Sequence, residues 1–336
     1  MAPVEPILIV KVIAAIVGGL VVLVWSAGRL VEGSAATAWH LRVPALIVGM
    51  VIIGFGTSAP EFTVSLLSGL QGKPELALGN AFGSNIANIG LILGVTAIVC
   101  PVFVHSQVLR LQLPLLCVAT LLSVALLLDG ELTRLDGAVL LIAFIALGVW
   151  SVLRGRRHED DALGVETTQE LDAHPMRLPV ALGWVGAGLV LLVVSSRALV
   201  WGAVEAATLL GVSDLLIGLT VVAIGTSLPE LASSIAATRK GESDLALGNV
   251  LGSNLLNTLA VVGAAVMAGG GMQIAPEVIT RDCVVMGVLT VSLFALAFGF
   301  RGRRGRISRA EGAGLLLAYV AYTVLLVVSA VGGRAG

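Results

Sequence analysis

The sequence predicts an all-α integral membrane protein of ten transmembrane helices, arranged as two inverted five-helix repeats. The chain of 336 residues is 57% hydrophobic and only 12% charged, whereas soluble domains carry about 25% charged residues. Apolar runs of roughly 20 residues, the length that spans a bilayer, recur along the chain, and one polar motif occurs in each half. Strands of a β-barrel would alternate polar and apolar residues instead, so the spans are expected to be helices.

Each expected helix follows from an apolar run and the polar residues that bound it. The first run, from about Pro6 to Arg29, lacks a basic leading segment and a clear cleavage site, so we expect a first span rather than a removed signal peptide. The only long polar segment, residues 154–177, is interpreted as a linker between two halves. The expected helices cover 6–32, 43–71, 75–100, 107–128 and 134–153 in the first repeat (1–153), and 178–208, 213–239, 244–268, 279–299 and 311–332 in the second (178–336).

Basic residues predict the orientation in the membrane. Arginines cluster after the fifth and the ninth expected helix, and both connections lie on the same side of a ten-helix arrangement. The positive-inside rule makes that side cytoplasmic. We therefore expect a multi-pass plasma (inner) membrane protein with the linker 154–177 in the cytoplasm and both termini outside. The clusters comprise Arg154, Arg156 and Arg157, and Arg301, Arg303, Arg304, Arg306 and Arg309.

A polar motif in the second expected helix, GTSAPEF at 56–62, recurs in the seventh as GTSLPEL at 225–231. The third helix carries GNAFGSNIANIG from Gly79, and the eighth carries GNVLGSNLLN from Gly248. Both pairs align without a gap under a single shift along the chain, the repeat shift, which places Gly79 on Gly248. This pattern indicates an internal duplication. Because each half has an odd number of helices, the halves are expected to insert with opposite topology.

The two motif glutamates, Glu61 and Glu230, indicate a functional site, because a carboxylate at membrane depth is costly to bury. Pro60 has no N–H for the carbonyl of Gly56 and its ring clashes there, so the helix is expected to kink or unwind at Gly56–Thr57. Irregular backbone at membrane depth is tolerated where it lines a cavity, and its freed carbonyls are good cation ligands. The equivalent positions in the second half are Gly225, Thr226 and Pro229.

The third and eighth expected helices add amide and hydroxyl oxygens on one face, because their polar residues recur every four positions. Neither motif contains His or Cys, so soft transition metals are disfavoured, whereas Ca²⁺ and Na⁺ prefer oxygen ligands. The three cysteines show no zinc spacing, no cofactor is expected, and the net charge of −1 argues against a nucleic-acid partner. The two rows are Asn80, Ser84 and Asn88, and Asn249, Ser253 and Asn257.

The paired GTSxPE and GNxxGSNxxN motifs resemble the α-repeats of the cation/Ca²⁺ exchanger superfamily, most closely those of prokaryotic Na⁺/Ca²⁺ exchangers. The resemblance implies that the two glutamates bind Ca²⁺, that the serines line flanking Na⁺ sites and that backbone carbonyls complete the coordination. Some members carry Asp at the position of Asn88 or Asn257, whereas this chain has Asn at both, which leaves two carboxylates and weakens any argument for K⁺ co-transport. The implied ion ligands are Glu61, Glu230, Thr57, Thr226, Ser58, Ser227, Ser84, Ser253, Asn88, Asn257, Gly54 and Ala223.

The leading hypothesis is a secondary antiporter, not an enzyme, that exchanges Na⁺ for Ca²⁺ by alternating access and functions as a monomer in the lipid bilayer. Both ions would compete for the two glutamates, while the first and sixth helices slide over the others. A Ca²⁺/H⁺ antiporter using the same glutamates is the alternative, although it leaves the serines unexplained. An ion channel is disfavoured because broken helices in an inverted repeat are typical of carriers. An intramembrane enzyme would need a nucleophile with a base, or a metal site, and the motifs supply neither.

Two further pairs of polar residues accompany the motifs. The hydroxyls of Ser65 and Ser234 are expected to bond to carbonyls of their own helices. Asn80 and Asn249 are compatible either with ion binding or with a contact that only joins two helices.

Overall fold

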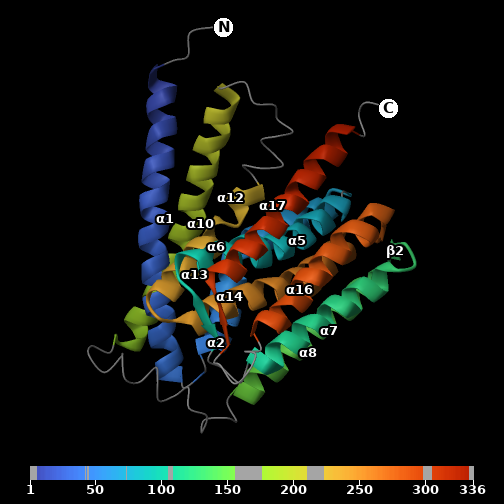
Figure 1. Ribbon diagram of the computed structural model, residues 1–336, viewed down its shortest axis with the longest axis horizontal. Coiled ribbons are helices and arrows are strands. Elements are labelled where there is room, and N and C mark those ends of the chain that lie inside the picture. Colours follow the sequence, from blue (N-terminus) through green and yellow to red (C-terminus); the bar gives the residue numbers. More distant parts are fainter. Residues whose placement is uncertain are drawn as a thin grey trace.

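The computed structural model describes residues 6–41, 43, 45–72, 74–104, 109–155, 176–209, 223–297 and 305–332. These residues form an all-helical bundle with two very short strand pairs, as the composition predicts (Figure 1). Among them, six helices are long and apolar enough to cross a membrane, and seven if one bent pair is counted as a single span. The chain is therefore an integral membrane protein.

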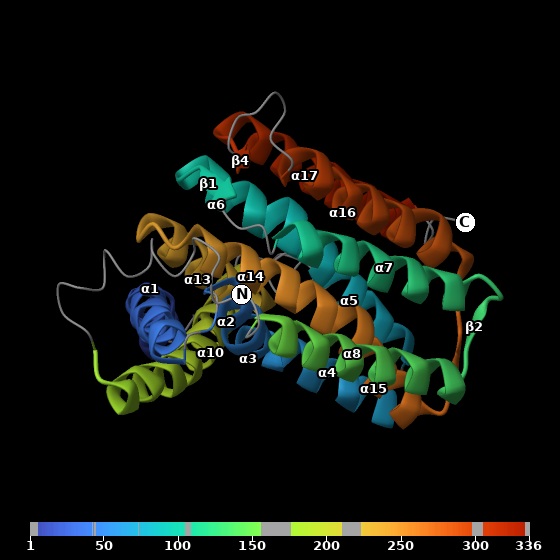
Figure 2. The same ribbon diagram turned by 90° about the horizontal axis from the view of Figure 1, so that it is seen from below.

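Helices α1 (Pro6–Leu41) and α10 (Leu178–Leu209) pack side by side along one flank of the bundle (Figures 1 and 2). Their outward faces carry exposed Ile, Val, Leu and Trp side chains, which suits contact with lipid. The sequence placed the end of the first helix near residue 32, which is wrong. Residues 33–41 contain no proline, and Pro44 is the next residue that disfavours helix before it.

Glycines allow α1 and α10 to approach closely. A Cβ atom on Gly19 would lie 3.0 Å from Ser195 O, and one on Gly188 would lie 2.9 Å from Leu30 Cβ. Gly33 and Gly202 are equally close to the partner helix. The repeat shift places Gly19 on Gly188 and Gly33 on Gly202, so the same contact occurs twice along this helix pair.

The second span is broken, as the proline predicts. It consists of α2 (Ala45–Val48), a π-helical turn η1 (Gly49–Gly54), α3 (Phe55–Thr57) and α4 (Ala59–Leu70), and it bends by 54° between Thr57 and Ala59. The break falls at Ser58, one residue after the expected Gly56–Thr57, because Pro60 occupies the first turn of the new helix, where no N–H is needed.

The seventh expected helix shows the same interruption, between α12 (Ala223–Thr226) and α13 (Leu228–Arg239). Ser227 has φ −90° and ψ 4°, close to the φ −83° and ψ 8° of Ser58. The expected start of this helix at 213 lies outside the described residues. A turn containing Gly241 (φ +83°) follows α13, and Gly72 (φ +69°) follows α4. Only glycine adopts this left-handed conformation readily, and the repeat shift places one of these glycines on the other.

The third and eighth spans run through the centre of the bundle. The third combines α5 (Pro74–Ala87), the π-helical turn η2 (Asn88–Leu93) and α6 (Gly94–Val99), and the eighth combines α14 (Ser243–Leu255), η4 (Leu256–Val261) and α15 (Val262–Gly269). Every residue of α14 is buried. The sequence did not predict the π-helical turns, which begin at Asn88 and immediately before Asn257. Such turns often occur at functional sites.

The remaining helices form the opposite flank of the bundle (Figure 2). β1 (Val102–Val104) pairs with β4 (Gly305–Ile307), and β2 (Glu131–Leu132) pairs with β3 (Met272–Gln273), both antiparallel. Figure 2 shows β1 and β4 at one end of the bundle and β2 at the other, so each end is closed by one strand from each half. The flanking helices are α7 (Leu109–Leu127), α8 (Arg134–Gly155), η5 with α16 (Val278–Cys283 and Val284–Ala297) and α17 (Arg309–Gly332).

Candidate ion-binding site

Glu61 and Glu230 lie in the first turns of α4 and α13, directly after the two helix breaks. Each is only 2% exposed. The helix macrodipole favours a carboxylate at this end of a helix, but burial of two carboxylates inside an apolar bundle remains costly without further partners. The breaks therefore place both acidic groups where their charge needs compensation.

Ser58 brings the break of the first half into contact with the glutamate of the second. Its Oγ donates to Glu230 Oε1 at 2.8 Å and lies 2.8 Å from Ser253 Oγ. Ser253 Oγ in turn donates to Gly54 O at 3.2 Å. Four of the predicted site residues, which come from three separate spans, therefore lie in one hydrogen-bonded group.

Asn249 provides a second connection between the halves. Its Oδ1 lies 3.2 Å from the hydroxyl of Thr57, within reach as an acceptor. The same Thr57 hydroxyl lies 2.9 Å from Ile53 O, to which it can also donate. Its Nδ2 donates to Glu230 O at 3.1 Å. Thr57 and Asn249 are both fully buried, so this amide connects the residue before one helix break to the backbone of the opposite glutamate.

Asn80 makes the equivalent contacts in the first half. Its Nδ2 donates to Glu61 O at 3.2 Å and to Ser65 Oγ at 2.9 Å, just as Asn249 Nδ2 donates to Glu230 O and, at 2.8 Å, to Ser234 Oγ. The repeat shift places each of these bonds on its equivalent in the other half. Both asparagines therefore fix the backbone of a glutamate to the next helix.

The expectation for the two serines beside them is wrong. Ser65 Oγ donates to Ala77 O of α5 at 3.3 Å and accepts from Asn80, and Ser234 Oγ accepts from Asn249. These hydroxyls join neighbouring helices because an amide from the next helix lies within reach. The paired spacing of Ser and Asn was the sequence signal that could have revealed this.

The central asparagines are buried where the third and eighth spans meet. Asn88 Nδ2 donates to Asn254 Oδ1 at 2.9 Å. Asn257 is fully buried, and neither of its polar side-chain atoms has a hydrogen-bond partner in the described part of the chain. Sequence reasoning did not assign Asn254 to the site, because its contact depends on how the two spans pack.

Partnerless oxygens give the site its chemistry. Glu61 Oε2, Glu230 Oε2 and Asn257 Oδ1 are buried, and none has a hydrogen-bond partner among the described residues. Leaving such atoms unpaired is unfavourable, and a hard cation is the ligand that satisfies several oxygens at once. Within the same part of the chain, no group of three or more His, Cys, Asp or Glu is suited to a metal ion, so the formal charge of the site rests on the two glutamates.

The remaining predicted site residues lie on the same helical segments. Ser227 is the residue at the second break, and it is 3% exposed. Ser84, on α5, is 8% exposed, and Thr226 is half-buried at the end of α12. Ala223 begins α12. The structure therefore places these four residues beside the second break or on the central helix, and their role as ligands stays a prediction.

An apolar helical bundle with two buried glutamates at helix breaks, surrounded by amide and hydroxyl oxygens, is typical of membrane ion transporters. The chain belongs to the sodium/calcium exchanger protein family, whose sequence profile matches residues 11–153 and 180–328. This result confirms the resemblance that the paired motifs indicated. The family consists of exchangers rather than a catalytic enzyme class.

Relatives share nearly the whole chain. The chain is 45% identical to the putative antiporter CaxA of Alkalimonas amylolytica, over 92% of this chain and 96% of the relative. It is 39% identical to the inner membrane protein YrbG of Escherichia coli, over 90% and 92%, and 29% identical to the sodium/calcium exchanger MaX1 of Methanosarcina acetivorans, over 92% and 96%. A structure of the sodium-calcium exchanger NCX_Mj soaked with Na⁺ and Ca²⁺ matches with a TM-score of 0.78 and 29% identity, covering 92% of this chain and 96% of that one.

Proposed function

We propose that the protein is a secondary antiporter that exchanges Na⁺ for Ca²⁺ across the membrane by alternating access, with both ions competing for Glu61 and Glu230. The observation that carries this proposal is the pair of buried glutamates whose Oε2 atoms have no hydrogen-bond partner among the described residues. Two carboxylates balance the charge of one Ca²⁺, and several Na⁺ can take its place. Family membership and the similarity to exchangers of known name support the same substrates.

The ligands follow from the geometry around each break. Ca²⁺ takes six to eight oxygens, and the glutamates, the central asparagines and the backbone carbonyls next to the breaks supply them. The hydroxyls beside the glutamates suit Na⁺, and Ser58 and Ser253 already lie in contact with each other. In this assignment Glu61, Glu230, Asn88 and Asn257 hold Ca²⁺, Gly54, Thr57, Ala223 and Thr226 offer carbonyls, and Ser58, Ser84, Ser227 and Ser253 line the Na⁺ positions.

We further propose that the chain contains two five-helix repeats of opposite topology, residues 1–153 and 178–336, joined by a cytoplasmic linker at 154–177. The matched bonds of Asn80 and Asn249, and the matched turns at Gly72 and Gly241, support a structural duplication. The location of the two strand pairs at opposite ends of the bundle supports the inversion. The linker and both termini then lie as the positive-inside rule predicts.

The moving part in this proposal is the pair α1 and α10. Their glycine contacts hold them together as one body, whereas the glutamates are bonded through Asn80 and Asn249 to the central helices. A body that carries no ion ligand can slide over the site and expose it to one side at a time. A disulfide between α1 and α4 should therefore abolish exchange while sparing Ca²⁺ binding.

The test is ⁴⁵Ca²⁺ uptake into proteoliposomes, driven first by an outward Na⁺ gradient and then by an outward proton gradient. Uptake that follows Na⁺ and is lost in Glu61→Gln and Glu230→Gln would support the proposal. Glu131→Gln is the matched control, because Glu131 is exposed in β2, where it accepts a hydrogen bond from Gln273. If neither the Na⁺ gradient nor the proton gradient drives ⁴⁵Ca²⁺ uptake, the assignment of substrates is refuted.

A Ca²⁺/H⁺ antiporter is the second candidate. It is favoured by the same partnerless Oε2 atoms, because a buried carboxylate that holds no cation can hold a proton instead. Uptake driven by protons alone would select this alternative and leave the contacts of Ser58 without a role in ion selection.

A further inference from the structure

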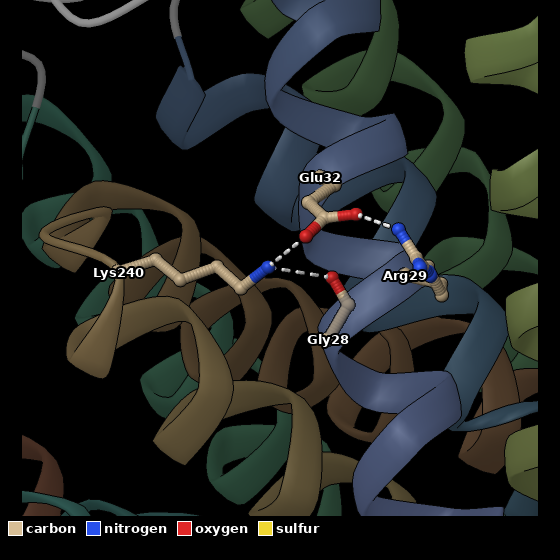
Figure 3. Close-up of polar contacts among 4 residues, drawn as sticks. All are labelled: Gly28, Arg29, Glu32 and Lys240. Atoms are coloured by element: carbon tan, nitrogen blue, oxygen red, sulfur yellow. Dashed lines mark hydrogen bonds and ion pairs between the residues drawn. The ribbon is translucent and has the colours of Figure 1, made fainter.

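An ion pair joins α1 to the turn between α13 and α14 (Figure 3). Lys240 Nζ lies 2.6 Å from Glu32 Oε1 and donates to Gly28 O at 3.1 Å. The second carboxylate oxygen of Glu32 accepts from Arg29 at 2.8 Å. Both oxygens of Glu32 are therefore engaged, one by Arg29 of its own helix and one by Lys240 of the turn after α13.

Arg29 extends this cluster to α10. Its guanidinium carbon lies 5.9 Å from the ring centroid of Trp25 and 5.2 Å from that of Trp184, whose rings meet edge to face. Cations favour the faces of Trp rings at such distances. Arg29 thus contacts both helices of the α1–α10 pair, so Lys240 holds the pair rather than α1 alone.

The cluster has no counterpart in the other half. Under the repeat shift, Glu32 corresponds to Trp201, Arg29 to Ala198 and Lys240 to Gln71. The bonds of Asn80 and Asn249, in contrast, occur in both halves. An equivalent ion pair therefore cannot form between α10 and the turn after α4.

In a carrier built from inverted repeats, alternating access is largely a rigid-body movement of one part against the other around the ion site, and two repeats of nearly the same structure can exchange their arrangements in that movement. A contact that has a counterpart in the other half can form in both states, so it does not change the difference in free energy between them. A contact without a counterpart belongs to one state, so its free energy shifts the equilibrium between them.

We propose that the Glu32–Lys240 ion pair is a latch that stabilises the access state described here over the opposite one. The latch connects the helix pair that moves to the frame that holds the glutamates, at the end of the bundle predicted to face the cytoplasm. This inference rests on the proposed alternating-access function and adds to it a residue pair that sets the balance of the two states.

The perturbation is to neutralise each partner with a side chain of similar size, in Lys240→Met, Glu32→Gln and the double variant. Arg239→Met is the matched control, because it removes an exposed positive charge next to Lys240. Partly exposed ion pairs contribute only modestly, so the equilibrium should shift by about two- to five-fold. Raising the ionic strength with choline chloride, which is not a substrate, should reduce the difference between the variants and the wild type, because salt screens the ion pair.

The readout is the half-saturating Ca²⁺ concentration measured separately from each face of the proteoliposomes. A shift in equilibrium raises this concentration on one face and lowers it on the other, and the double variant should resemble each single variant. Changes in the same direction on both faces, or changes that add in the double variant, would overturn the latch, because a general loss of structure acts in that way.

A distance measurement separates failure of the latch from failure of the proposed function. Spin labels at the exposed positions Val10 on α1 and Val288 on α16, in a background without the three native cysteines, report the position of α1. Lys240→Met should increase a second population of distances, and Arg239→Met should not. If the wild type transports no Ca²⁺ but this population still responds, the latch stands and the substrate assignment fails. An unchanged distribution refutes the latch.

Discussion

Asn249 offers the sharpest test of how the site is built. We expect Asn249→Leu to weaken both the fold and Ca²⁺ binding, because the amide makes four contacts that leucine cannot make. Nδ2 lies within hydrogen-bond distance of Glu230 O, Ser233 Oγ and Ser234 Oγ, and Oδ1 lies beside Thr57 Oγ1. Leucine has the same number of side-chain heavy atoms and the same branching as asparagine, so the change leaves no cavity.

The magnitude follows from these contacts. A buried hydrogen bond contributes about 1 kcal/mol, and the two hydrogens of Nδ2 together with Oδ1 make about three such bonds at a time, which gives about 3 kcal/mol. Thr57 Oγ1 keeps its bond to Ile53 O, which reduces the loss in stability to about 2 kcal/mol. The bond that positions the backbone of Glu230 accounts for about 1.4 kcal/mol of ion affinity, so the dissociation constant for Ca²⁺ should rise about ten-fold.

Two other asparagines provide the comparison. Asn80→Leu should have a smaller effect, because Asn80 is half-buried and donates to two acceptors. Asn85 is as buried as Asn249, but it donates to Thr258 and Met286 instead of a glutamate, so Asn85→Leu should lower stability with Ca²⁺ affinity intact. Calorimetric Ca²⁺ titration and thermal unfolding measure both quantities. Equal losses of Ca²⁺ affinity in Asn85→Leu and Asn249→Leu would refute the positioning role.

Three further predictions follow from particular contacts. Gly252→Ala should destabilise the protein by about 1–3 kcal/mol, because a Cβ atom there would overlap the Met50 backbone. Its counterpart Gly83→Ala should be tolerated, because no atom lies within 4 Å of a Cβ atom at that position. Thermal unfolding of the two variants tests this difference in stability. Ser58→Ala should raise the half-saturating Na⁺ concentration for exchange, because Ser58 Oγ bonds Glu230 Oε1; a Na⁺ dependence like that of the wild type would contradict this. Tyr322→Phe should lower the stability by about 1–2 kcal/mol without changing Ca²⁺ affinity, because it removes one hydrogen bond to Asp282. An altered affinity in a Ca²⁺ titration would show that the contact between Tyr322 and Asp282 influences the site.

The sequence predicted the class of fold and the two helix breaks because both depend on local features. A glutamate and a proline in an apolar run are visible without neighbours, and the break at Ser58 confirms what Pro60 implied. The contacts between halves were not predictable, since Thr57 and Asn249 are far apart in the chain and meet only through helix packing. The π-helical turns at Asn88 and Asn257 were not predictable for a similar reason. Their sequence retains a helical pattern, and only the three-dimensional structure shows the wider turn.

The two copies of the motif adopt different arrangements in one structure. Ser58 Oγ donates to Glu230 Oε1, whereas no hydrogen bond joins the counterparts Ser227 and Glu61 in the described part of the chain. Because the two motifs are nearly identical in sequence, each copy can adopt the arrangement of the other at little cost in free energy. Under the proposed function, this exchange is the transport step, and an ion that satisfies both glutamates makes it easier by neutralising their charge. The free energy that decides between the two arrangements must then come from residues that differ between the halves, which is why the contact between Glu32 and Lys240 matters more than its modest strength suggests.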